Sequence, residues 1–318
     1  MNESFGPKSR IGEENLREFT ARSDGPSLRR ILLQWMAILA TAAALLSTNS
    51  PAVWTGAGTV LLGALLASIF APFHECLHGT AFRSRKLNHV VAGVNGILFG
   101  IGPTTFRAFH FAHHRHTHDP QLDPELIYLP RTSSFDSTRP GNRVIWVVLS
   151  SGVGLLYLKV IITGSLALLP RRWWTKRMEW LPPSRHRAAV FESRVIIAAW
   201  GGLTAISLLG VPSLVWIVIS ALLSHLYLGL WLTTEHTGLP DRGTIFDRTR
   251  TILASPFVRW WIWNMNYHTE HHAWPAVPWH RLPTLHETVN DDLAHRENGY
   301  PEAHYAALVN SRDEPGTT

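Results

Sequence analysis

Eight of the chain's eighteen histidines lie in three short clusters. The clusters read H-E-C-L-H at 74–78, H-F-A-H-H at 110–114 and H-T-E-H-H at 268–272. On a helix, positions i, i+3 and i+4 share one face, so each cluster turns its imidazoles in one direction. Imidazole binds iron, copper, zinc and nickel, whereas Mg²⁺ and Ca²⁺ prefer oxygen. The clusters therefore predict a transition-metal site, with the candidate ligands His74, His78, His110, His113, His114, His268, His271 and His272.

The first cluster by itself matches H-E-x-x-H, in which two histidines hold zinc and the glutamate activates water for peptide hydrolysis. In that interpretation His74 and His78 are zinc ligands and Glu75 is the general base. A catalytic zinc takes three protein ligands, so the other two clusters would have no role. Eight imidazoles suit two metals with about four ligands each. Because the ligands are neutral, the metal charge stays uncompensated, which favours a redox-active centre of iron first and copper second.

The composition indicates a membrane protein. Apolar residues make up 46% of the chain and charged residues only 16%, against about 25% charged in typical soluble domains. Fourteen tryptophans are present, and indole rings favour membrane–water interfaces. With this much apolar sequence, the net charge of +6 fits basic loops facing an anionic leaflet and not a nucleic-acid partner. Cys76 is the single cysteine, which excludes an intrachain disulfide and zinc–thiolate clusters.

Long apolar segments occur in a regular arrangement around the clusters. Crossing a bilayer takes about 20 helical residues. Asn49-Ser50-Pro51 is a predicted turn between the first two segments, and Gly210-Val211-Pro212 is a second one. Glycine and proline interrupt the stretch at 87–106 too often for a span. The candidate segments are Ile31–Thr48, Ala52–Phe73, Val144–Leu169, Val195–Leu209 and Val211–Thr234.

The number of crossings follows from where the clusters must lie. If the second and third clusters share one side of the membrane, the chain crosses an even number of times between them. The arginine-rich linker at 170–194 belongs in the cytoplasm by the positive-inside tendency. We therefore expect Val144–Leu169, which contains Lys159, to lie in the interface or to dip in and return. Five spans, the alternative, would put His268 on the opposite side from His74.

The expected fold class is an all-α integral membrane protein with four transmembrane helices in two hairpins. Interfacial helices and a cytosolic cap that carries the histidine clusters complete it. The predicted regions are a cytosolic N-terminal tail at 1–30, a membrane domain at 31–290 and a cytosolic C-terminal tail at 291–318. Residues 1–30 are polar and lack the apolar core of a secretory signal, so we expect a multi-pass protein with its site on the cytoplasmic side.

The three clusters resemble the histidine boxes of the membrane fatty acid desaturase superfamily, which also includes hydroxylases and ketolases. The third is the most specific, because it resembles the pattern H-x-x-H-H-x-x-P-x-x-P-x-x-x-L-P-x-L-H. The second is similar through its Asp-Pro pairs at 119–120 and 123–124. The resemblance covers roughly residues 30–290, and the matching positions after the third cluster are Pro275, Pro278, Leu282, Pro283 and His286.

This resemblance implies two iron ions held by the eight histidines, with O₂ as co-substrate for oxidation of an unactivated C–H bond. It makes His236 a candidate ninth ligand, although a histidine that only supports a ligand is the alternative. His116 and His118 lie outside the H-x-x-H-H face. His225, inside a span, is expected to line a substrate channel or to satisfy a buried carbonyl. Ligating imidazoles need a partner for their second nitrogen, and the candidate partners are Glu75, Asp119, Asp123, Glu235 and Glu270.

The third box favours desaturation of a fatty acyl chain or a related lipid-like substrate. The alternative is a hydroxylase or ketolase that acts on a metabolite other than a fatty acid. No His-Pro-Gly-Gly haem motif is present, so an external electron donor of the ferredoxin, rubredoxin or cytochrome b5 type is expected. The basic linker at 170–194 suits an acidic partner or an anionic lipid surface. A metal transporter is a remote alternative, because it would need ionisable residues within several spans.

Overall fold

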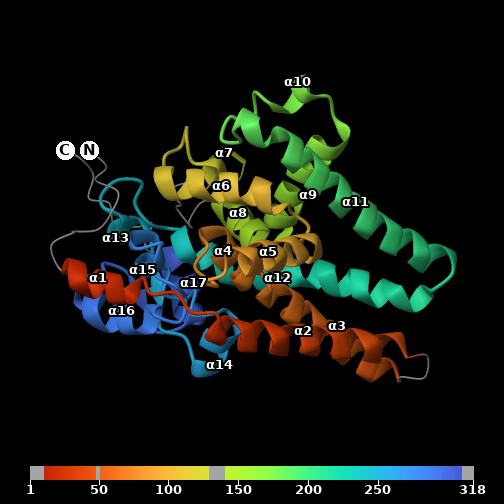
Figure 1. Ribbon diagram of the computed structural model, residues 1–318, viewed down its shortest axis with the longest axis horizontal. Coiled ribbons are helices and arrows are strands. Elements are labelled where there is room, and N and C mark those ends of the chain that lie inside the picture. The colour runs from red at the N-terminus through yellow and green to blue at the C-terminus, as the bar shows by residue number, and fades with distance from the viewer. Residues whose placement is uncertain (1–10, 48–50, 129–139, 310–318) are drawn as a thin grey trace. The chain divides into compact units, whose positions relative to one another are not determined.

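The structure is a computed structural model that describes residues 11–47, 51–128 and 140–309, and the regular secondary structure of these residues is almost entirely helical (Figure 1). The chain forms two compact units, each built from separate stretches of sequence. Unit 1 comprises residues 1–22, 111–151 and 229–318, and unit 2 comprises residues 23–110 and 152–228. Two helices continue from one unit into the other, α6 (Pro103–His116) and α12 (Val215–His236).

Four helical segments are long and apolar enough to cross a membrane: 25–46, 52–78, 183–209 and 212–236. They correspond to α2 (Gly25–Leu46), α3 (Ala52–Ser68) continued by α4 (Phe70–His78), η1 (Pro183–Arg185) continued by α11 (His186–Leu209), and η2 (Pro212–Leu214) continued by α12. The predicted fold class with four such helices is confirmed. The first predicted turn is Asn49-Ser50-Pro51, and its first two residues lie outside the described residues.

Helix α2 shows how the sequence separates a packed face from an outer face. Ile31, Gln34 and Ile38 recur at the helical period and are buried against the rest of unit 2. Gln34 Nε2 donates to Ser68 Oγ of α3 at 2.6 Å, so α2 and α3 are joined by a buried polar contact. The opposite face exposes large apolar side chains, such as Leu39 at 68%. An apolar outer face of this kind suits lipid.

The segment at 144–169 forms two helices instead of one. They are α8 (Pro140–Ser150), in unit 1, and α9 (Val153–Leu168), in unit 2. Each is shorter than a bilayer span, as expected for a segment that does not cross as one straight helix. Gly152 at the break has φ 74°, and a Cβ there would lie 1.7 Å from the carbonyl oxygen of His225. Only glycine fits this close approach.

The glycine-rich stretch at 87–106 forms a corner between two helices of unit 2. Helix α5 (Arg85–Phe99) ends at Gly100, whose φ of 85° is the left-handed conformation typical of a helix C-terminus. Helix α6 starts after two further residues. Beyond α9, the short helix α10 (Arg171–Trp174) lies in the basic linker.

Unit 1 consists of short helices around one small pair of strands. β1 (Thr251–Ile252) and β2 (Arg296–Glu297) run parallel, and Thr251 is opposite Arg296. This pair is the only departure from an all-α fold among the described residues. The remaining helices are α1 (Glu13–Phe19), α7 (Pro124–Tyr128), α13 (Ile245–Arg248), α14 (Pro256–Trp261), α15 (His268–Ala273), α16 (Leu282–Val289), η3 (Asn290–Asp292) and α17 (Tyr300–Val309).

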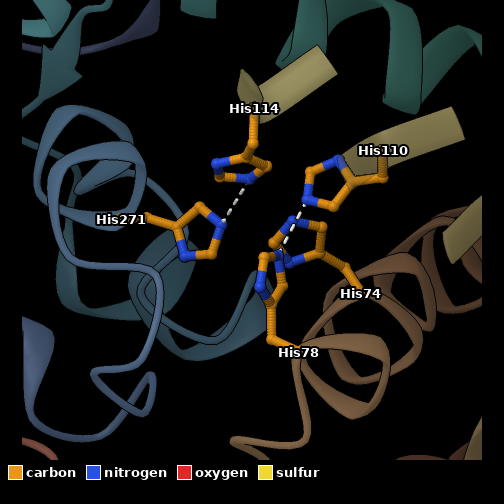
Figure 2. Close-up of side chains that lie close together, drawn as sticks. All are labelled: His74, His78, His110, His114 and His271. Atoms are coloured by element: carbon orange, nitrogen blue, oxygen red, sulfur yellow. Dashed lines mark hydrogen bonds between the residues drawn. The ribbon is translucent and has the colours of Figure 1, made fainter. Parts of the chain in front are cut away.

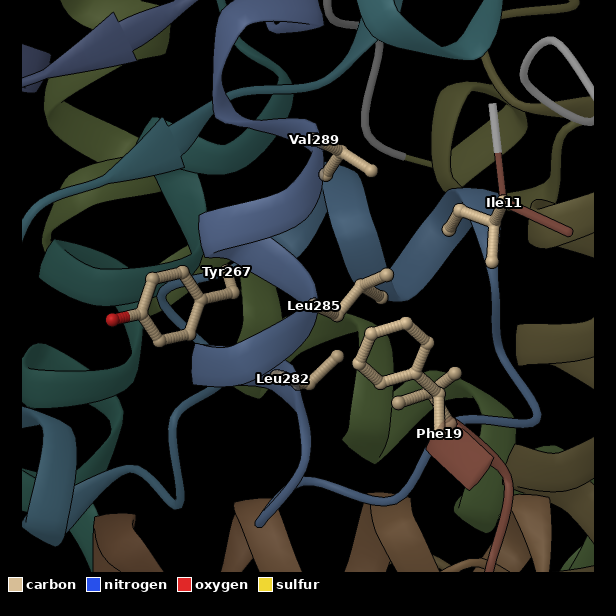
Figure 3. Packing of buried hydrophobic residues seen from close by; sticks show 7 residues of the cluster. Ile11, Phe19, Tyr267, Leu282, Leu285 and Val289 are labelled. Carbon is tan, nitrogen blue, oxygen red and sulfur yellow. The ribbon is translucent and has the colours of Figure 1, made fainter. Parts of the chain in front are cut away.

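An apolar cluster connects the N-terminal helix to α16 within unit 1 (Figure 3). Ile11 precedes α1 and Phe19 is its last residue, and both belong to one apolar cluster with Leu282, Leu285 and Val289 of α16. Burying one such side chain stabilises the fold by about 1.5–3 kcal/mol. The predicted N-terminal tail therefore contributes to the core of this unit, next to the segment that follows the third histidine cluster.

Candidate metal centre

Unit 2 brings three of the predicted ligands together. His74 and His78 lie one turn apart on α4, and His110 lies on α6. Their ligand nitrogens are all within 4.8 Å of one another, and Nε2 of His78 is 2.8 Å from Nε2 of His110. Figure 2 shows these three imidazoles turned toward a common point. His74 and His110 are buried.

Aromatic packing holds this group of three. The Phe106 ring stacks on the His110 ring with centroids 5.6 Å apart and on Phe73 at 5.4 Å. Phe70 lies beside His74 with ring centroids 5.8 Å apart. Arg107 also donates a hydrogen bond to the carbonyl of Leu77 and so ties α6 to α4. The imidazoles therefore project from two packed helices into an apolar environment.

Glu75, the central residue of H-E-x-x-H, is completely buried. Its Oε2 accepts a hydrogen bond from Thr80 Oγ1 at 2.7 Å, and its carbonyl accepts a second one from the same hydroxyl at 3.1 Å. These contacts tie the carboxylate to the turn that follows α4. A structural contact of this kind differs from the water-activating role that the zinc-protease interpretation gives to Glu75.

Unit 1 contains a second group of buried histidines. His236 ends α12, and its Nε2 lies 3.2 Å from Nε2 of His113 and 2.8 Å from Nε2 of His268. His272 joins them, since the ligand nitrogens of His113, His236 and His272 are within 4.8 Å of one another. The structure therefore places His236 in the middle of this group. The sequence alone left open whether His236 is a ligand or only supports one.

His114 and His271 form a further pair in unit 1. Their Nε2 atoms are 3.2 Å apart, as the dashed line in Figure 2 shows. The His114 ring also stacks on His272 with centroids 4.0 Å apart. All nine predicted ligands thus contact another predicted ligand of their own unit. Helix α6 carries proposed ligands of both units. His110 belongs to unit 2, and His114, one turn later, belongs to unit 1.

The second nitrogen of three of these imidazoles faces an oxygen atom, which is hydrogen-bonded in His113 and His236 and at a longer distance in His268. Nδ1 of His113 is hydrogen-bonded to both Asp123 oxygens at 3.0 and 3.1 Å. Nδ1 of His236 donates to the Arg248 carbonyl at 3.1 Å, and Nδ1 of His268 lies 3.5 Å from Glu235 Oε1. A partner on Nδ1 selects the tautomer that leaves the Nε2 lone pair for a metal. Asp123 and Glu235 were among the predicted partners, whereas the Arg248 carbonyl gives no sequence signal.

The Asp123 carboxylate is well suited to hold His113. Its burial raises the pKa, but the His113 imidazole and the backbone N–H groups of His118 and Glu125 stabilise the anion and leave the pKa lowered overall. An ionised carboxylate is the stronger acceptor for an imidazole N–H. Asp123 therefore orients His113 and raises its basicity as a ligand.

Two other predicted partners have different contacts. Glu270 is fully buried, and its carboxylate accepts hydrogen bonds from Thr251 Oγ1 and binds His286 Nδ1, each at 2.5 Å. This carboxylate therefore joins α15 to β1 and α16. Asp119 caps the next turn through Oδ1, which accepts from the N–H groups of Gln121 and Leu122. His286 is one of the positions at which the third box matches the family pattern, whereas no local signal pointed to Thr251.

The other three histidines named in the sequence analysis are His116, His118 and His225, and two of them bind backbone carbonyls. His118 has φ 65° and donates through Nδ1 to the Pro240 carbonyl at 2.8 Å. His225, inside α12, has its Nδ1 2.9 Å from the Ala221 carbonyl, which fits the prediction that it satisfies a buried carbonyl. His116 is partly exposed.

The environment of the His272 ring indicates whether these residues suit a metal. Both of its ring nitrogens are buried without a hydrogen-bond partner, although an unsatisfied buried polar group costs about 1–3 kcal/mol. Burial and then the imidazoles of His114 and His268 lower its pKa well below the usual range, so the ring is neutral and keeps a lone pair. Burial and His113 likewise lower the pKa of His271 to about 3.

The spacing between imidazoles also suits a metal. Two nitrogens bound about 2.1 Å from one metal at right angles lie about 3 Å apart. The closest Nε2 pairs in the two groups are separated by 2.8 to 3.2 Å. Clustered imidazoles, most of them buried and two of them held neutral by their surroundings, therefore fit a transition metal such as iron.

Comparison with known proteins assigns the family. The sequence profile of the family described as "Fatty acid desaturase" matches residues 48–304, which include every predicted ligand. The chain belongs to the fatty acid desaturase family. The superfamily resemblance noted in the sequence is confirmed, and the chain is an integral membrane protein of the desaturase and oxygenase class.

Relatives within this family carry out several reactions. The chain is 26% identical over 259 residues to "Beta-carotene 4-ketolase 3" of Haematococcus lacustris, covering 79% of this chain and 68% of the relative. It is 25% identical to "Sphingolipid delta(4)-desaturase DES1" of Drosophila melanogaster, covering 70% and 62%. It is 26% identical to "Dihydrorhizobitoxine desaturase" of Bradyrhizobium elkanii, covering 69% and 63%. These names support the oxidase class but not one substrate.

Proposed function

We propose that this protein catalyses the O₂-dependent oxidation of an unactivated C–H bond with two iron ions held by its histidines. The proposal rests on one observation above all. Imidazoles gather in each unit with Nε2 atoms 2.8 to 3.2 Å apart, and all of them lie within the residues that match the family. The proposed ligands are His74, His78, His110, His113, His114, His236, His268, His271 and His272.

His236 is included because its environment is that of a ligand. Its Nδ1 is occupied by the Arg248 carbonyl, and its Nε2 faces two other proposed ligands, His113 and His268. A histidine that only supported a ligand would instead use a nitrogen to bind that ligand's Nδ1. In His113 that nitrogen is already bonded to Asp123.

Bound iron would supply the reduction of O₂ and the oxidising power for C–H cleavage. The protein's own contribution is to orient the ligands and to exclude water. Asp123 and the Arg248 carbonyl hold imidazoles in one tautomer, as described above. The rings of Phe70, Phe73 and Phe106 border His74 and His110, which keeps this side of the site apolar. An apolar surrounding protects an oxidising centre from side reactions with solvent.

We propose desaturation of an acyl chain or another lipid-like substrate, in agreement with the third box and with the apolar surroundings of His74 and His110. A ketolase or hydroxylase reaction on a non-fatty-acid metabolite is the second candidate. It is favoured by the carotene ketolase, which matches a larger share of this chain than the two desaturases do.

Expression in a host without the activity, followed by mass spectrometry of lipids and small metabolites, tests the proposal. Loss of two hydrogens from the product supports desaturation, and gain of an oxygen atom supports the second candidate. Metal analysis of the purified protein should give about two irons per chain. One zinc and no iron would overturn the proposal in favour of the metalloprotease alternative.

The proposed reaction needs electrons from an external donor of the ferredoxin, rubredoxin or cytochrome b5 type. The basic linker is exposed and offers a docking surface for an acidic donor or for anionic lipid, through Arg171, Arg172, Lys176, Arg177, Arg185 and Arg187. We place this linker and the site on the cytoplasmic side by the positive-inside tendency. Turnover with each purified donor at rising salt concentration separates these possibilities, since salt weakens protein docking at an exposed charged surface.

A further inference from the structure

Helix α6, which carries three of the proposed ligands, begins without a cap from its own sequence. Gly102 occupies the position before Pro103, and its carbonyl accepts the first helical hydrogen bond, from Phe106 N, at 2.9 Å. A side-chain oxygen at this position normally satisfies one of the exposed N–H groups at the start of a helix. Glycine has no side chain, so α6 needs a partner from another segment.

Glu192 of α11 supplies that partner within unit 2. Its Oε2 accepts a hydrogen bond from the Thr104 backbone N–H at 2.9 Å, and its Oε1 accepts one from Thr104 Oγ1 at 2.6 Å. A carboxylate at a helix N-terminus is also stabilised by the helix dipole. A Cβ at Gly102 would lie 2.5 Å from Glu192 Oε2, so the missing side chain is what allows this approach.

The other side of the same corner is held by a charge of opposite sign. Lys159 of α9 donates to the carbonyl of Phe99 at the end of α5 and lies 3.6 Å from the centre of the Phe99 ring. Thr163, one turn further along α9, donates to the Gly100 carbonyl at 3.2 Å. A cation at a helix C-terminus matches the dipole, as the anion does at the N-terminus of α6.

The two charges therefore have a shared structural role. An acidic side chain on a long apolar helix is costly in a membrane and is retained where it has a partner or a function. Glu192 lies on such a helix, and its partner is the first turn of α6, about two turns before His110. We infer that Glu192 is a positioning residue for the metal centre. It fixes the start of α6 and thereby the direction in which His110, His113 and His114 project.

This inference rests on the proposed metal-binding function, so its test measures metal binding directly. Wild-type protein and the variants Glu192→Ala, Glu192→Gln and Thr104→Ala are purified in detergent, stripped of metal and titrated with Co²⁺. Visible absorption reports both affinity and ligand geometry, and thermal unfolding of the metal-free protein is recorded separately. Glu179→Ala serves as the control, because Glu179 is an exposed acid of the same unit.

We expect Glu192→Ala to weaken Co²⁺ binding by about tenfold and to change the absorption spectrum, at the lower end of the effect of residues that orient ligands. Glu192→Gln should retain most of the affinity, since its amide oxygen still accepts from Thr104 N–H. Thr104→Ala keeps that backbone bond and should have a smaller effect than Glu192→Ala. Glu179→Ala should bind like the wild type.

A Glu192→Ala protein with wild-type affinity and spectrum overturns the inference, even if its unfolding temperature falls. If Glu192→Ala does not fold, Thr104→Ala decides, because loss of the hydroxyl contact to Glu192 Oε1 should still weaken Co²⁺ binding measurably. Wild-type affinity and spectrum in Thr104→Ala then also overturn the inference. Failure of the proposed function looks different. In that case wild-type protein itself binds no Co²⁺, or binds it equally well after His271→Ala.

Discussion

At the scale of single residues, the proposed ligands differ in what their ring nitrogens contact. His113 has an ionised carboxylate, His236 has a backbone carbonyl, and His272 has no hydrogen-bond partner on either nitrogen. An imidazole without a partner is destabilising in the metal-free protein and useful in the metal-bound one. Stability and metal binding should therefore respond in opposite directions to a change at His272.

Replacing His272 with phenylalanine tests this opposition. The apolar ring removes two unsatisfied nitrogens, so the metal-free protein should unfold at the same temperature as the wild type or higher, with a gain of up to about 1–3 kcal/mol. Iron content and activity should be lost. Thermal unfolding of metal-free samples, together with metal analysis, checks both parts. A large drop in metal-free stability would contradict the proposed role of His272.

Asp123→Asn removes the anion that holds His113. We expect metal affinity to fall by about 10-fold to 100-fold, the usual effect of losing such a partner. Asp119→Asn is a matched control four residues earlier, because Asp119 caps a turn and is not bonded to a proposed ligand. Metal titration of both variants measures the difference. Equal affinities would show that Asp123 has no part in ligand orientation.

Glu75→Gln distinguishes iron oxidation from zinc-dependent hydrolysis. The amide can still accept the hydrogen bond from Thr80 that the carboxylate accepts at 2.7 Å, so activity should fall only in part. A general base for water attack would instead lose nearly all activity on this change. Turnover of the variant relative to the wild type, measured at equal metal content, is the deciding quantity.

At the scale of secondary-structure elements, close approaches determine how the helices of unit 2 fit together. The break between α8 and α9 brings Gly152 against the backbone of His225 in α12. The corner between α5 and α6 is held by Lys159 and Glu192 from α9 and α11. In this unit, a glycine allows two helices to approach closely, and polar side chains bound to helix ends hold the corner between two others.

Gly152→Ala should be strongly destabilising for this reason. The new Cβ would lie 1.7 Å from a carbonyl oxygen, and φ 74° already costs an alanine about 1–2 kcal/mol. Gly164→Ala in the same helix α9 is the control, since a Cβ there meets nothing within 4 Å and alanine favours helix by about 0.5–1 kcal/mol. Thermal unfolding in detergent should rank the variants in that order. Equal stabilities would mean that the α9–α12 approach is loose.

At the scale of the whole molecule, histidines from widely separated parts of the sequence are proposed to bind the same cofactor. A metal bound by these ligands would stabilise the folded state over the unfolded state, because the ligands come together only on folding. The family match covers residues 48–304, which include all nine proposed ligands.

Removal of metal should therefore lower the unfolding temperature and abolish activity, and added Fe²⁺ should restore both. Calorimetry or a thermal-shift measurement with and without a chelator checks the first part. His271→Ala provides the control, since a protein that has already lost its metal should not respond to the chelator. An unchanged unfolding temperature after complete iron removal would contradict a metal centre assembled from these ligands.

The sequence by itself determined the candidate ligands, the four apolar helices and the family. The signals for the ligands and for the apolar helices are both local. Helical spacing places His110, His113 and His114 along one helix, and the length of an apolar segment indicates a span. The expectation that the segment at 144–169 lies in the interface or dips in and returns came from the count of crossings, and the bend of 68° between its two helices is compatible with it. Local reasoning also identified Asp123 and Glu235 as candidate partners of proposed ligands, because Asp123 follows the second box and Glu235 adjoins His236 in the sequence.

Only the tertiary structure decided which groups support those ligands. Thr104 and Glu192 are 88 positions apart, and the carbonyl that holds His236 belongs to an arginine that no motif includes. Glu270 binds Thr251 and His286 and so supports α15 as a whole. A hydrogen bond between distant segments leaves no periodic or compositional trace, because either partner would look the same in a solvated loop. These contacts form only when the chain folds, and they orient histidines that can already be recognised in the sequence.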